Sequence, residues 1–570
     1  MISMSFKAAI VLALPIFAAA QTPDQRCADL THVNAATFPN HTIVVTSAAL
    51  KAASQAVTKP GGRGNVPALP QHCEVIGKLN ERTGASSQQY AIKFHMRLPV
   101  AWNSKFFFEG GGGSNGNLGD AYGNLQGQQT TNALTLGYAV VSQDSGHDNS
   151  LNNDPTLNGA QTFGFDEQAR LDFGYNSYDQ VTQTAKALIK TYYGKAPERS
   201  YYVGCSEGGR EAMMISQRFP DYYDGILACS PGFKLPKAAI AEAWDTQALA
   251  AVPKATSIND PNGEPFINKA FTDEDLTLVS RAVLDACDNL DGLADGIISN
   301  FAACKAALVH PKLAALTCKA ENQAACLTAI QVTALEKVFA GPKNSKGEAL
   351  YSDWTFDAGI SNPGWRVWKL GMFNAPTNSS INALLGSAAI SAVFTTPPTP
   401  VAATGPAPLK YLLDFNFDTE APKIYAESGA FSKASWDFMR ADSTNLAAFR
   451  KHGGKLLITH GVSDPIFSVN DTISWVNEVN KVNGGKASDF VRFFAVPGMT
   501  HCGGGPSTDR YDAFAALVSW VEKKAPPDSI VATAGLNTPW PGRTRPLCQY
   551  PAYPHYDAGS IEDASSFTCK

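Results

Sequence analysis

Gly204-Cys205-Ser206-Glu207-Gly208 is the stretch of this sequence that decides the predicted fold. It follows an apolar segment that favours a strand (200–203) and precedes a segment that favours a helix (210–219). A serine between small residues at a turn from strand to helix is typical of an α/β-hydrolase, because the sharp turn exposes its hydroxyl at the edge of the sheet. We therefore predict an α/β-hydrolase fold with Ser206 as the nucleophile.

Two later loops supply the partners that a serine nucleophile needs. Asp464 follows a predicted strand over 455–460, and His501 follows a predicted strand over 490–496. The chain order Ser, Asp, His is the order of the triad in α/β-hydrolases. His501 would accept the proton of the serine hydroxyl, and Asp464 would hold the imidazole in the required tautomer.

Three other side chains compete for these roles. His460 stands at the end of the strand before Asp464 and is interpreted as structural. Asp471 is a rival acid, but it lies at a predicted helix start, where capping is the favoured role. His147 follows a predicted strand (138–142), and we favour loop packing over a place in the site.

The cysteines point to the same site. Cys205 and Cys502 are the immediate neighbours of Ser206 and His501, so their sulfurs come within bonding reach if the triad forms. With eleven cysteines one is left over, and we expect it to be the core residue Cys229. The sequence does not fix the other pairs, but nearness suggests Cys27–Cys73, Cys287–Cys304, Cys318–Cys326 and Cys548–Cys569.

Composition narrows the class of protein. The chain of 570 residues has a net charge of −5 and only 17% charged residues, which argues against a nucleic-acid partner. Residues 1–20 combine a lysine, an apolar run and three alanines, as in a cleaved secretory signal peptide. No other segment is long and apolar enough to span a membrane. We expect a secreted or periplasmic monomer without a membrane anchor.

Strand and helix patterns alternate in two separate parts of the chain. They run up to about residue 232 and resume at about residue 444, which predicts a doubly wound, mostly parallel sheet with helices on both faces. The pattern between them is irregular, with Pro/Thr-rich stretches such as 395–400. We predict a hydrolase core of residues 21–232 and 444–570, interrupted by a lid domain of residues 233–443.

Ester cleavage places negative charge on the carbonyl oxygen, and backbone N–H groups must already point to it. The residue after the nucleophile, Glu207, would supply one such group. The glycine run 110–113 would supply the other, because glycine lets the backbone approach a ligand closely. Gly113 is favoured over Gly112, and a merely flexible turn is the alternative.

An acidic run in the predicted lid favours a hard cation. Asp288, Asp291 and Asp295 are closely spaced with glycines between them, which suits oxygen coordination of calcium together with the carbonyls of Leu293 and Ile297. The spacing is not that of an EF-hand, and a solvated acidic turn is the alternative. A calcium ion here would be structural, because the triad needs no metal.

The set Cys205-Ser206, Asp464 and His501-Cys502 resembles the signature of the tannase and feruloyl esterase family, and the resemblance extends over nearly the whole mature chain. It implies a lid that folds over the triad and holds calcium in its 287–297 segment. It also implies that Trp368 and Phe467 lie against the substrate.

The chain departs from the family members that it resembles most, which hydrolyse a half-ester of terephthalate. Those enzymes grip the free carboxylate with a lid arginine, whereas this chain has no arginine between Arg366 and Arg440 and offers Ile381 or a neighbour. Gly112 also stands where they carry a serine, which would widen the pocket. Loss of a bidentate arginine contact should lower the preference for an anionic ester by roughly ten- to hundredfold.

We thus expect a serine esterase that forms an acyl-enzyme on a small aromatic ester, without an organic cofactor. A terephthalate half-ester is the first candidate, and a feruloyl or galloyl ester is the alternative. A secreted peptidase and a non-catalytic binding module are the other classes considered.

Overall fold

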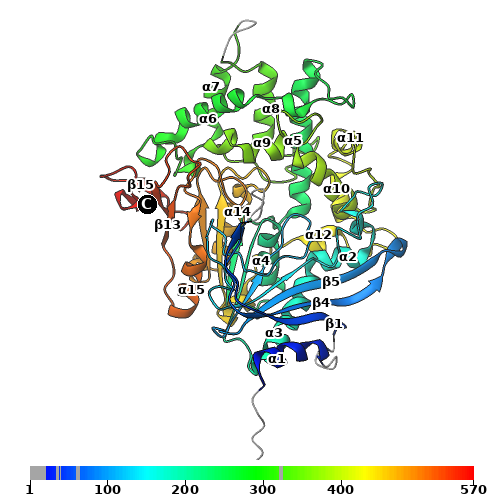
Figure 1. Ribbon diagram of the computed structural model, residues 1–570. Coiled ribbons are helices and arrows are strands. Elements are labelled where there is room, and N and C mark those ends of the chain that lie inside the picture. Colours follow the sequence, from blue (N-terminus) through cyan, green and yellow to red (C-terminus); the bar gives the residue numbers. More distant parts are fainter. Residues whose placement is uncertain (1–20, 34–37, 39, 59–64, 320–324) are drawn as a thin grey trace, which may run out of the picture.

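The computed structural model describes residues 21–33, 38, 40–58, 65–319 and 325–570, so the predicted signal peptide lies outside the described residues. A nine-stranded sheet in the order β1-β4-β5-β7-β6-β8-β9-β10-β11 forms its centre (Figure 1). The strands are β1 (Ile43–Lys51), β4 (His72–Thr83), β5 (Gln89–Pro99), β6 (Lys105–Glu109), β7 (Ala139–Gln143), β8 (Arg199–Cys205), β9 (Gly225–Cys229), β10 (Lys455–Gly461) and β11 (Val491–Val496). Neighbours from β7 to β11 are parallel, and those from β1 to β7 are antiparallel. The mostly parallel sheet of an α/β-hydrolase is confirmed.

Helices cover both faces of this sheet because its strands are apolar on both faces. Side chains alternate along β6, so that Phe106 and Phe108 enter one core and Phe107 enters the other. The first core is closed by α3 (Ser177–Tyr193), α4 (Glu207–Arg218) and α14 (Val469–Val482). The second is closed by α15 (Ala513–Lys523).

The chain leaves the sheet between the neighbouring strands β9 and β10, and we call residues 230–454 the excursion. It lies over one end of the sheet in Figure 1. The expected irregular structure is wrong, because much of the excursion is helical. Its main helices are α5 (Leu235–Ala255), α6 (Asp273–Cys287), α7 (Ala306–Ala315), α8 (Ala329–Phe339) and α9 (Pro363–Lys369). Helix α5 buries four consecutive residues, 238–241, so it lacks the one-sided apolar stripe by which a helix is recognised.

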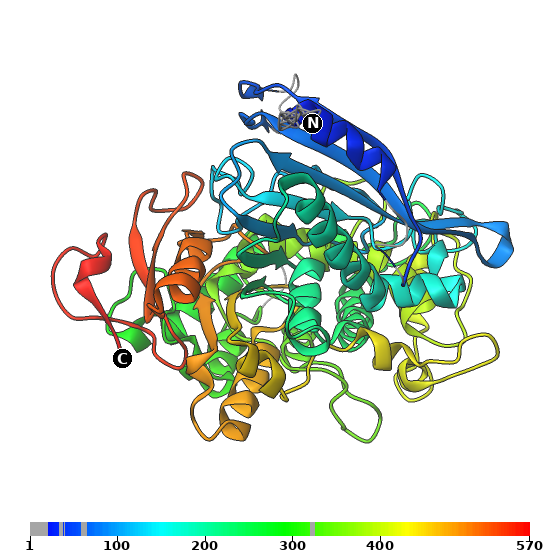
Figure 2. The same cartoon turned by 90° about the horizontal axis from the view of Figure 1, so that it is seen from below.

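Helix α1 (Pro23–Asp29), near the start of the described residues, and the C-terminus lie on different sides of the molecule (Figure 2). This helix packs beside β1 and is joined to β4 by the Cys27–Cys73 disulfide. The C-terminal part adds a small sheet of β12 (Arg510–Tyr511), β13 (Ser529–Thr533) and β14 (Thr544–Cys548). All five expected disulfides are present, and Cys229 is a free, buried thiol.

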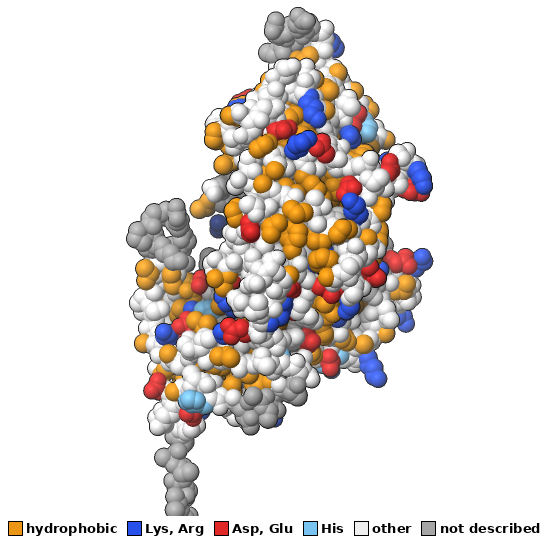
Figure 3. Space-filling model, turned by 90° about the vertical axis from the view of Figure 1, so that its right-hand side faces the viewer, with side chains coloured by type: hydrophobic (Ala, Val, Ile, Leu, Met, Phe, Trp, Pro, Cys, Tyr) orange, Lys and Arg blue, Asp and Glu red, His pale blue; other side chains and the backbone are white. Residues whose placement is uncertain are grey.

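The surface agrees with the mild net charge. On the face in Figure 3, acidic and basic side chains are interspersed and neither sign forms an extended patch. Among the described residues, no helix has both the length and the apolar character needed to cross a membrane.

Candidate active site

Ser206 stands on the sharp turn between β8 and α4. Its backbone has φ 64° and ψ −121°, a conformation that side-chain-bearing residues rarely adopt. The turn is possible because its neighbours are small: a Cβ on Gly204 would lie 2.5 Å from the carbonyl oxygen of Gly208, and a Cβ on Gly208 would lie 2.6 Å from that of Gly111. The predicted strand–turn–helix around Ser206 is therefore present.

The structure brings Ser206, His501 and Asp464 together in one hydrogen-bonded line. Nε2 of His501 lies 2.8 Å from Oγ of Ser206, and Nδ1 lies 2.8 Å from Oδ2 of Asp464. Asp464 is buried, whereas Ser206 and His501 keep partial exposure. A reactant can thus reach the serine and the imidazole but not the carboxylate.

The surroundings of Asp464 keep it ionised. Burial alone would raise its pKa, but the charge and hydrogen bond of His501, together with those of His460, hold the pKa of Asp464 well below its usual range. Its Oδ1 also accepts the backbone N–H groups of Ile466 (2.9 Å) and Phe467 (3.1 Å). A fixed negative charge therefore faces Nδ1 of His501.

The rival residues have other partners. His460 is fully buried, and its two ring nitrogens lie 2.9 Å from the hydroxyl of Thr472 and the carbonyl oxygen of Phe467. Asp471 accepts a hydrogen bond from Lys234 at 2.6 Å. His147 stacks on the ring of Phe163 with centroids 3.8 Å apart. His147 and Asp471 contact none of Ser206, His501 and Asp464. His460 lies against the carboxylate of Asp464, with its Nε2 3.5 Å from Oδ2.

Two backbone N–H groups beside the serine turn have no protein acceptor among the described residues. They belong to Glu207, the first residue of α4, and to Gly113, which has φ 60°. A Cβ at Gly112 or Gly113 would meet no heavy atom within 4 Å, so there is open space in front of this run. These are the two positions expected to form an oxyanion hole.

Aromatic rings flank the exposed side of the imidazole. Trp368 of α9 and Phe467 lie edge-on to His501, with ring centroids at 5.7 and 5.4 Å. Phe467 packs with Ala238 of α5, so the excursion and the core meet here. The two aromatic positions implied by the resemblance thus lie beside the histidine.

A sulfur cluster lies next to the serine and histidine. Cys205 and Cys502 form a disulfide with a Cα–Cα distance of 6.1 Å, and Sγ of Cys229 lies within 4.8 Å of both sulfurs. Because two of the three sulfurs are bonded to each other, the cluster is not a metal site. Burial raises the pKa of Cys229 to about 12, so this thiol is an inert core residue, as expected.

Asp357, in the excursion, is a site neighbour that the sequence analysis missed. One of its oxygens accepts the hydroxyl of Ser463 at 2.8 Å and the backbone N–H of Gly498 at 2.7 Å. It therefore joins the loop before Asp464 to the loop before His501. Its partners are 106 and 141 residues away, and no local pattern marks such a contact.

The acidic run forms a tight loop after α6. Asp291 is buried, accepts backbone N–H groups of Leu293 and Ser299, and has a pKa that burial raises to about 7. Asp288 accepts the N–H of Gly296 at 2.9 Å, and no described cationic side chain pairs with either residue. Asp295 instead pairs with Arg545, and its other oxygen accepts the N–H of Ile297.

Comparisons with known proteins extend this description. The model of the family "Tannase and feruloyl esterase" matches residues 73–570. The chain is 47% identical to mono(2-hydroxyethyl) terephthalate hydrolase of Piscinibacter sakaiensis over 93% of this chain and 89% of that protein. It is 28% identical to a probable feruloyl esterase of Arthroderma benhamiae over 85% and 83%.

Solved structures show the same fold. Feruloyl esterase B from Aspergillus oryzae superposes with a TM-score of 0.71 at 23% identity, covering 96% of this chain and all of that one. The match of the family model over most of the chain, the identity to the hydrolase and the shared fold agree with one another. The chain belongs to the tannase and feruloyl esterase family of carboxylic ester hydrolases.

Proposed function

We propose that Ser206, His501 and Asp464 are the catalytic triad and that the substrate is a small ester of an aromatic acid. Mono(2-hydroxyethyl) terephthalate is the first candidate, with terephthalate and ethylene glycol as products. The observation that carries the triad is the unbroken line of two 2.8 Å hydrogen bonds from Ser206 through His501 to Asp464. The observation that favours this ester is the 47% identity to its hydrolase.

The geometry supports a two-step mechanism. Oγ of Ser206 attacks the ester carbonyl while Nε2 of His501 takes its proton, and Asp464 stabilises the resulting imidazolium. The N–H groups of Glu207 and Gly113 bind the oxyanion, and the first of them gains from the positive end of α4. His501 then protonates the leaving alcohol, activates a water molecule and releases the acid from Ser206.

The excursion acts as a lid in this proposal, with residues 233–443 as its extent. Trp368 would pack against the aromatic ring of the acyl group from the lid side and Phe467 from the core side. Their edge-on contacts with His501 support this, because a ring between them would lie next to the acylated serine. One chain holds every group that the reaction uses, so a monomer suffices.

We propose that the lid holds a structural calcium ion. Asp291 supports this, because a buried carboxylate without a cationic partner among the described residues lacks a countercharge that a metal ion would supply. The ligands would be Asp288, Asp291, Asp295 and the carbonyls of Leu293 and Ile297. Asp295 would have to share its carboxylate between the ion and Arg545.

Hydrolysis of a neutral feruloyl or galloyl ester is the second candidate. It is favoured because the cationic side chains of the lid near Trp368 are already paired with acidic residues. Arg366 and Lys369 flank Trp368 in sequence, but Arg366 pairs with Asp273 and Lys369 with the buried Asp245. The segment around Ile381 carries no cation. No side chain of this part of the lid is thus poised to grip a substrate carboxylate.

We propose export from the cytoplasm, with residues 1–20 as the signal peptide. Five disulfides support this, since they persist in oxidising compartments. Sequencing the N-terminus of the secreted protein would test it, with Gln21 as the expected first residue.

The substrate is tested by comparing kcat/KM for mono(2-hydroxyethyl) terephthalate, bis(2-hydroxyethyl) terephthalate and methyl ferulate with calcium present. A clear preference for the half-ester supports the first candidate, and a preference for either neutral ester supports the second. The variant Ser206→Ala is the control for all three. If it keeps full activity on the preferred ester, the triad is wrong.

A further inference from the structure

The glycine run that carries Gly113 has no side chains of its own to fix it. Glycine has the widest choice of backbone conformations, so each peptide unit between Gly110 and Gly113 can rotate unless something outside the run holds it. An oxyanion donor must be oriented before the reaction, because reorienting it later would cost part of its benefit. What holds the run therefore bears on the rate.

Three successive peptide units of the run are each held by one hydrogen bond. The N–H of Gly111 donates to Oε2 of Glu211 at 3.0 Å. The C=O of Gly111 accepts the N–H of Gly208 at 3.1 Å, and the C=O of Gly112 accepts the N–H of Asn115 at 3.0 Å. In a planar trans peptide the C=O and N–H point in opposite directions, so the last bond also sets the direction of the Gly113 N–H.

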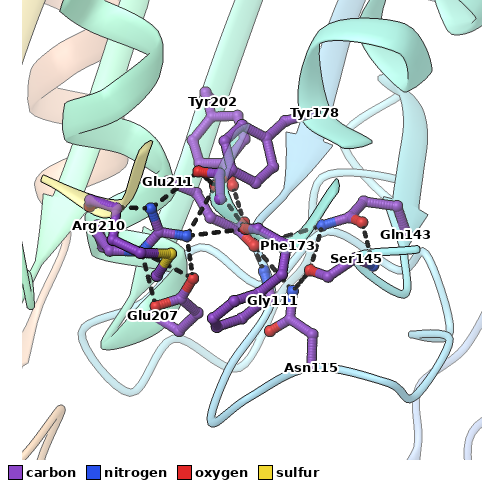
Figure 4. A network of polar contacts seen from close by, with 12 residues as sticks. Gly111, Asn115, Gln143, Ser145, Phe173, Tyr178, Tyr202, Glu207, Arg210 and Glu211 are labelled. Atoms are coloured by element: carbon purple, nitrogen blue, oxygen red, sulfur yellow. Dashed lines mark hydrogen bonds and ion pairs between the residues drawn. The ribbon is translucent and has the colours of Figure 1, made fainter. Parts of the chain in front are cut away.

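Glu211 lies at the centre of this arrangement (Figure 4). It is fully buried on the first turns of α4, and both of its oxygens are used. Oε2 accepts Gly111 N–H and the hydroxyl of Tyr202, and Oε1 accepts the amides of Asn115 (2.8 Å) and Gln143 (3.3 Å). One carboxylate thus holds both sides of the Gly112–Asn115 turn. It binds the backbone N–H of Gly111 before the turn and the side chain of Asn115 at its end.

We infer that Glu211 is a positioning residue that keeps the Gly112–Gly113 peptide unit turned so that its N–H points into the oxyanion hole. The inference rests on the proposed function of Ser206 and Gly113. Glu211 touches neither the substrate nor the reacting atoms. Without it, the N–H of Gly111 loses its acceptor and the Asn115 side chain keeps only its contact with Ser145, so the peptide unit is less firmly held and can turn its carbonyl toward the oxyanion.

The variant Glu211→Gln tests this with almost no change of shape. All four groups around Glu211 are donors, whereas a glutamine has a single accepting oxygen and brings an NH2 group against two of them. The matched control is Glu109→Gln. Glu109 stands just before the run at the end of β6, and its carboxylate likewise accepts backbone hydrogen bonds, from the N–H groups of Gly123 (3.1 Å) and Asn124 (3.2 Å).

The readout is the ratio of kcat/KM for 4-nitrophenyl benzoate to that for its thiono analogue, in which sulfur replaces the carbonyl oxygen. Sulfur accepts hydrogen bonds poorly, so a well-formed oxyanion hole favours the oxygen ester. The ratio does not depend on the fraction of folded enzyme. We expect it to fall at least tenfold in Glu211→Gln, with KM for the oxygen ester within threefold, and to stay unchanged in Glu109→Gln.

An unchanged ratio in folded Glu211→Gln would overturn the inference, as would an equal fall in both variants. If Glu211→Gln does not fold, Asn115→Gly decides in the same way, because glycine tolerates the φ of 47° at this position and the change removes the amide that donates to Glu211, together with its contact to Ser145. Ser206→Ala keeps the proposals separate: if it remains active the triad fails, and if it is inactive while the ratio is unchanged only the role of Glu211 fails.

Discussion

Removing the Cys205–Cys502 disulfide should damage catalysis more than its effect on stability explains. Both cysteines must be replaced by serine, since the Cys229 sulfur lies within 4.8 Å of each and could pair with a single remaining thiol. The bond spans 297 residues. For a loop of this length, the loop-closure entropy of the unfolded chain predicts that removing the bond lowers the free energy of unfolding by about 5.7 kcal/mol. The shorter disulfide loops 287–304 and 318–326 lie inside this span and reduce the figure slightly.

The matched control is the double serine variant of Cys27 and Cys73. This bond spans 46 residues and joins α1 to β4 far along the chain from the triad, and the same relation gives about 4.0 kcal/mol for its removal. Both variants should therefore melt at lower temperature. Only the 205/502 variant removes the covalent link between the serine turn and the histidine loop. A misplacement of about 1 Å between catalytic groups lowers the rate by about a hundredfold.

The assay is kcat for a 4-nitrophenyl ester at 15 °C, divided by the folded fraction from circular dichroism. Because Asp357 still holds Gly498 near the histidine, we expect a fall of about ten- to hundredfold in the 205/502 variant and less than twofold in the control. Equal kcat per folded molecule in the two variants would refute the reasoning. The disulfide would then stabilise the fold without positioning His501.

Four further predictions follow from single side chains. Asp464→Asn should lower kcat by about ten-thousandfold while the fold is kept, since His501 would settle in the wrong tautomer; a loss below tenfold would contradict this. Burial raises the pKa of Asp357 to about 6, so between about pH 4 and pH 6 the folded protein keeps a proton that the unfolded chain releases. The free energy of unfolding should therefore fall as the pH rises through this range. Asp357→Asn should remove up to about 3 kcal/mol of that fall in urea unfolding, and identical pH profiles would refute it. A calcium chelator should lower the Tm of the native enzyme but not of Asp291→Asn. Ile381→Arg should raise the preference for the half-ester over its diester by about tenfold or more, whereas the exposed Leu384→Arg should not.

The hydrogen-bonded line of Ser206, His501 and Asp464 and the disulfides were predictable because their signals are local. Ser206 lies in a short motif that needs one strand before it and one helix after it, and both are set by nearby residues. The disulfide partner of Cys205 could be inferred once Ser206 and His501 were paired. Each of the strands β6 to β11 contains a short continuous apolar run, which is typical of a parallel sheet buried on both faces.

The excursion and the contacts of the site could not be predicted in the same way. Helix α5 is buried on several sides, so no period of apolar residues reveals it. Glu211 and Gly111 are 100 residues apart, and the only local sign of the network is the group of charged residues Glu207, Arg210 and Glu211 at the start of a buried helix. A charge at a buried position indicates a partner, but the sequence does not say which one.

These long-range contacts join the excursion to the candidate active site. Asp357 belongs to the excursion, and one of its oxygens holds the loops of both Asp464 and His501 through Ser463 and Gly498. Trp368, on the next helix, contacts the imidazole ring itself. If the excursion were exchanged between relatives to change the substrate, the exchange would therefore also change the support of Asp464 and His501. Such an exchange should alter kcat as well as KM unless the new segment brings a carboxylate to the place of Asp357, because no other described side chain of the excursion is hydrogen-bonded to both loops.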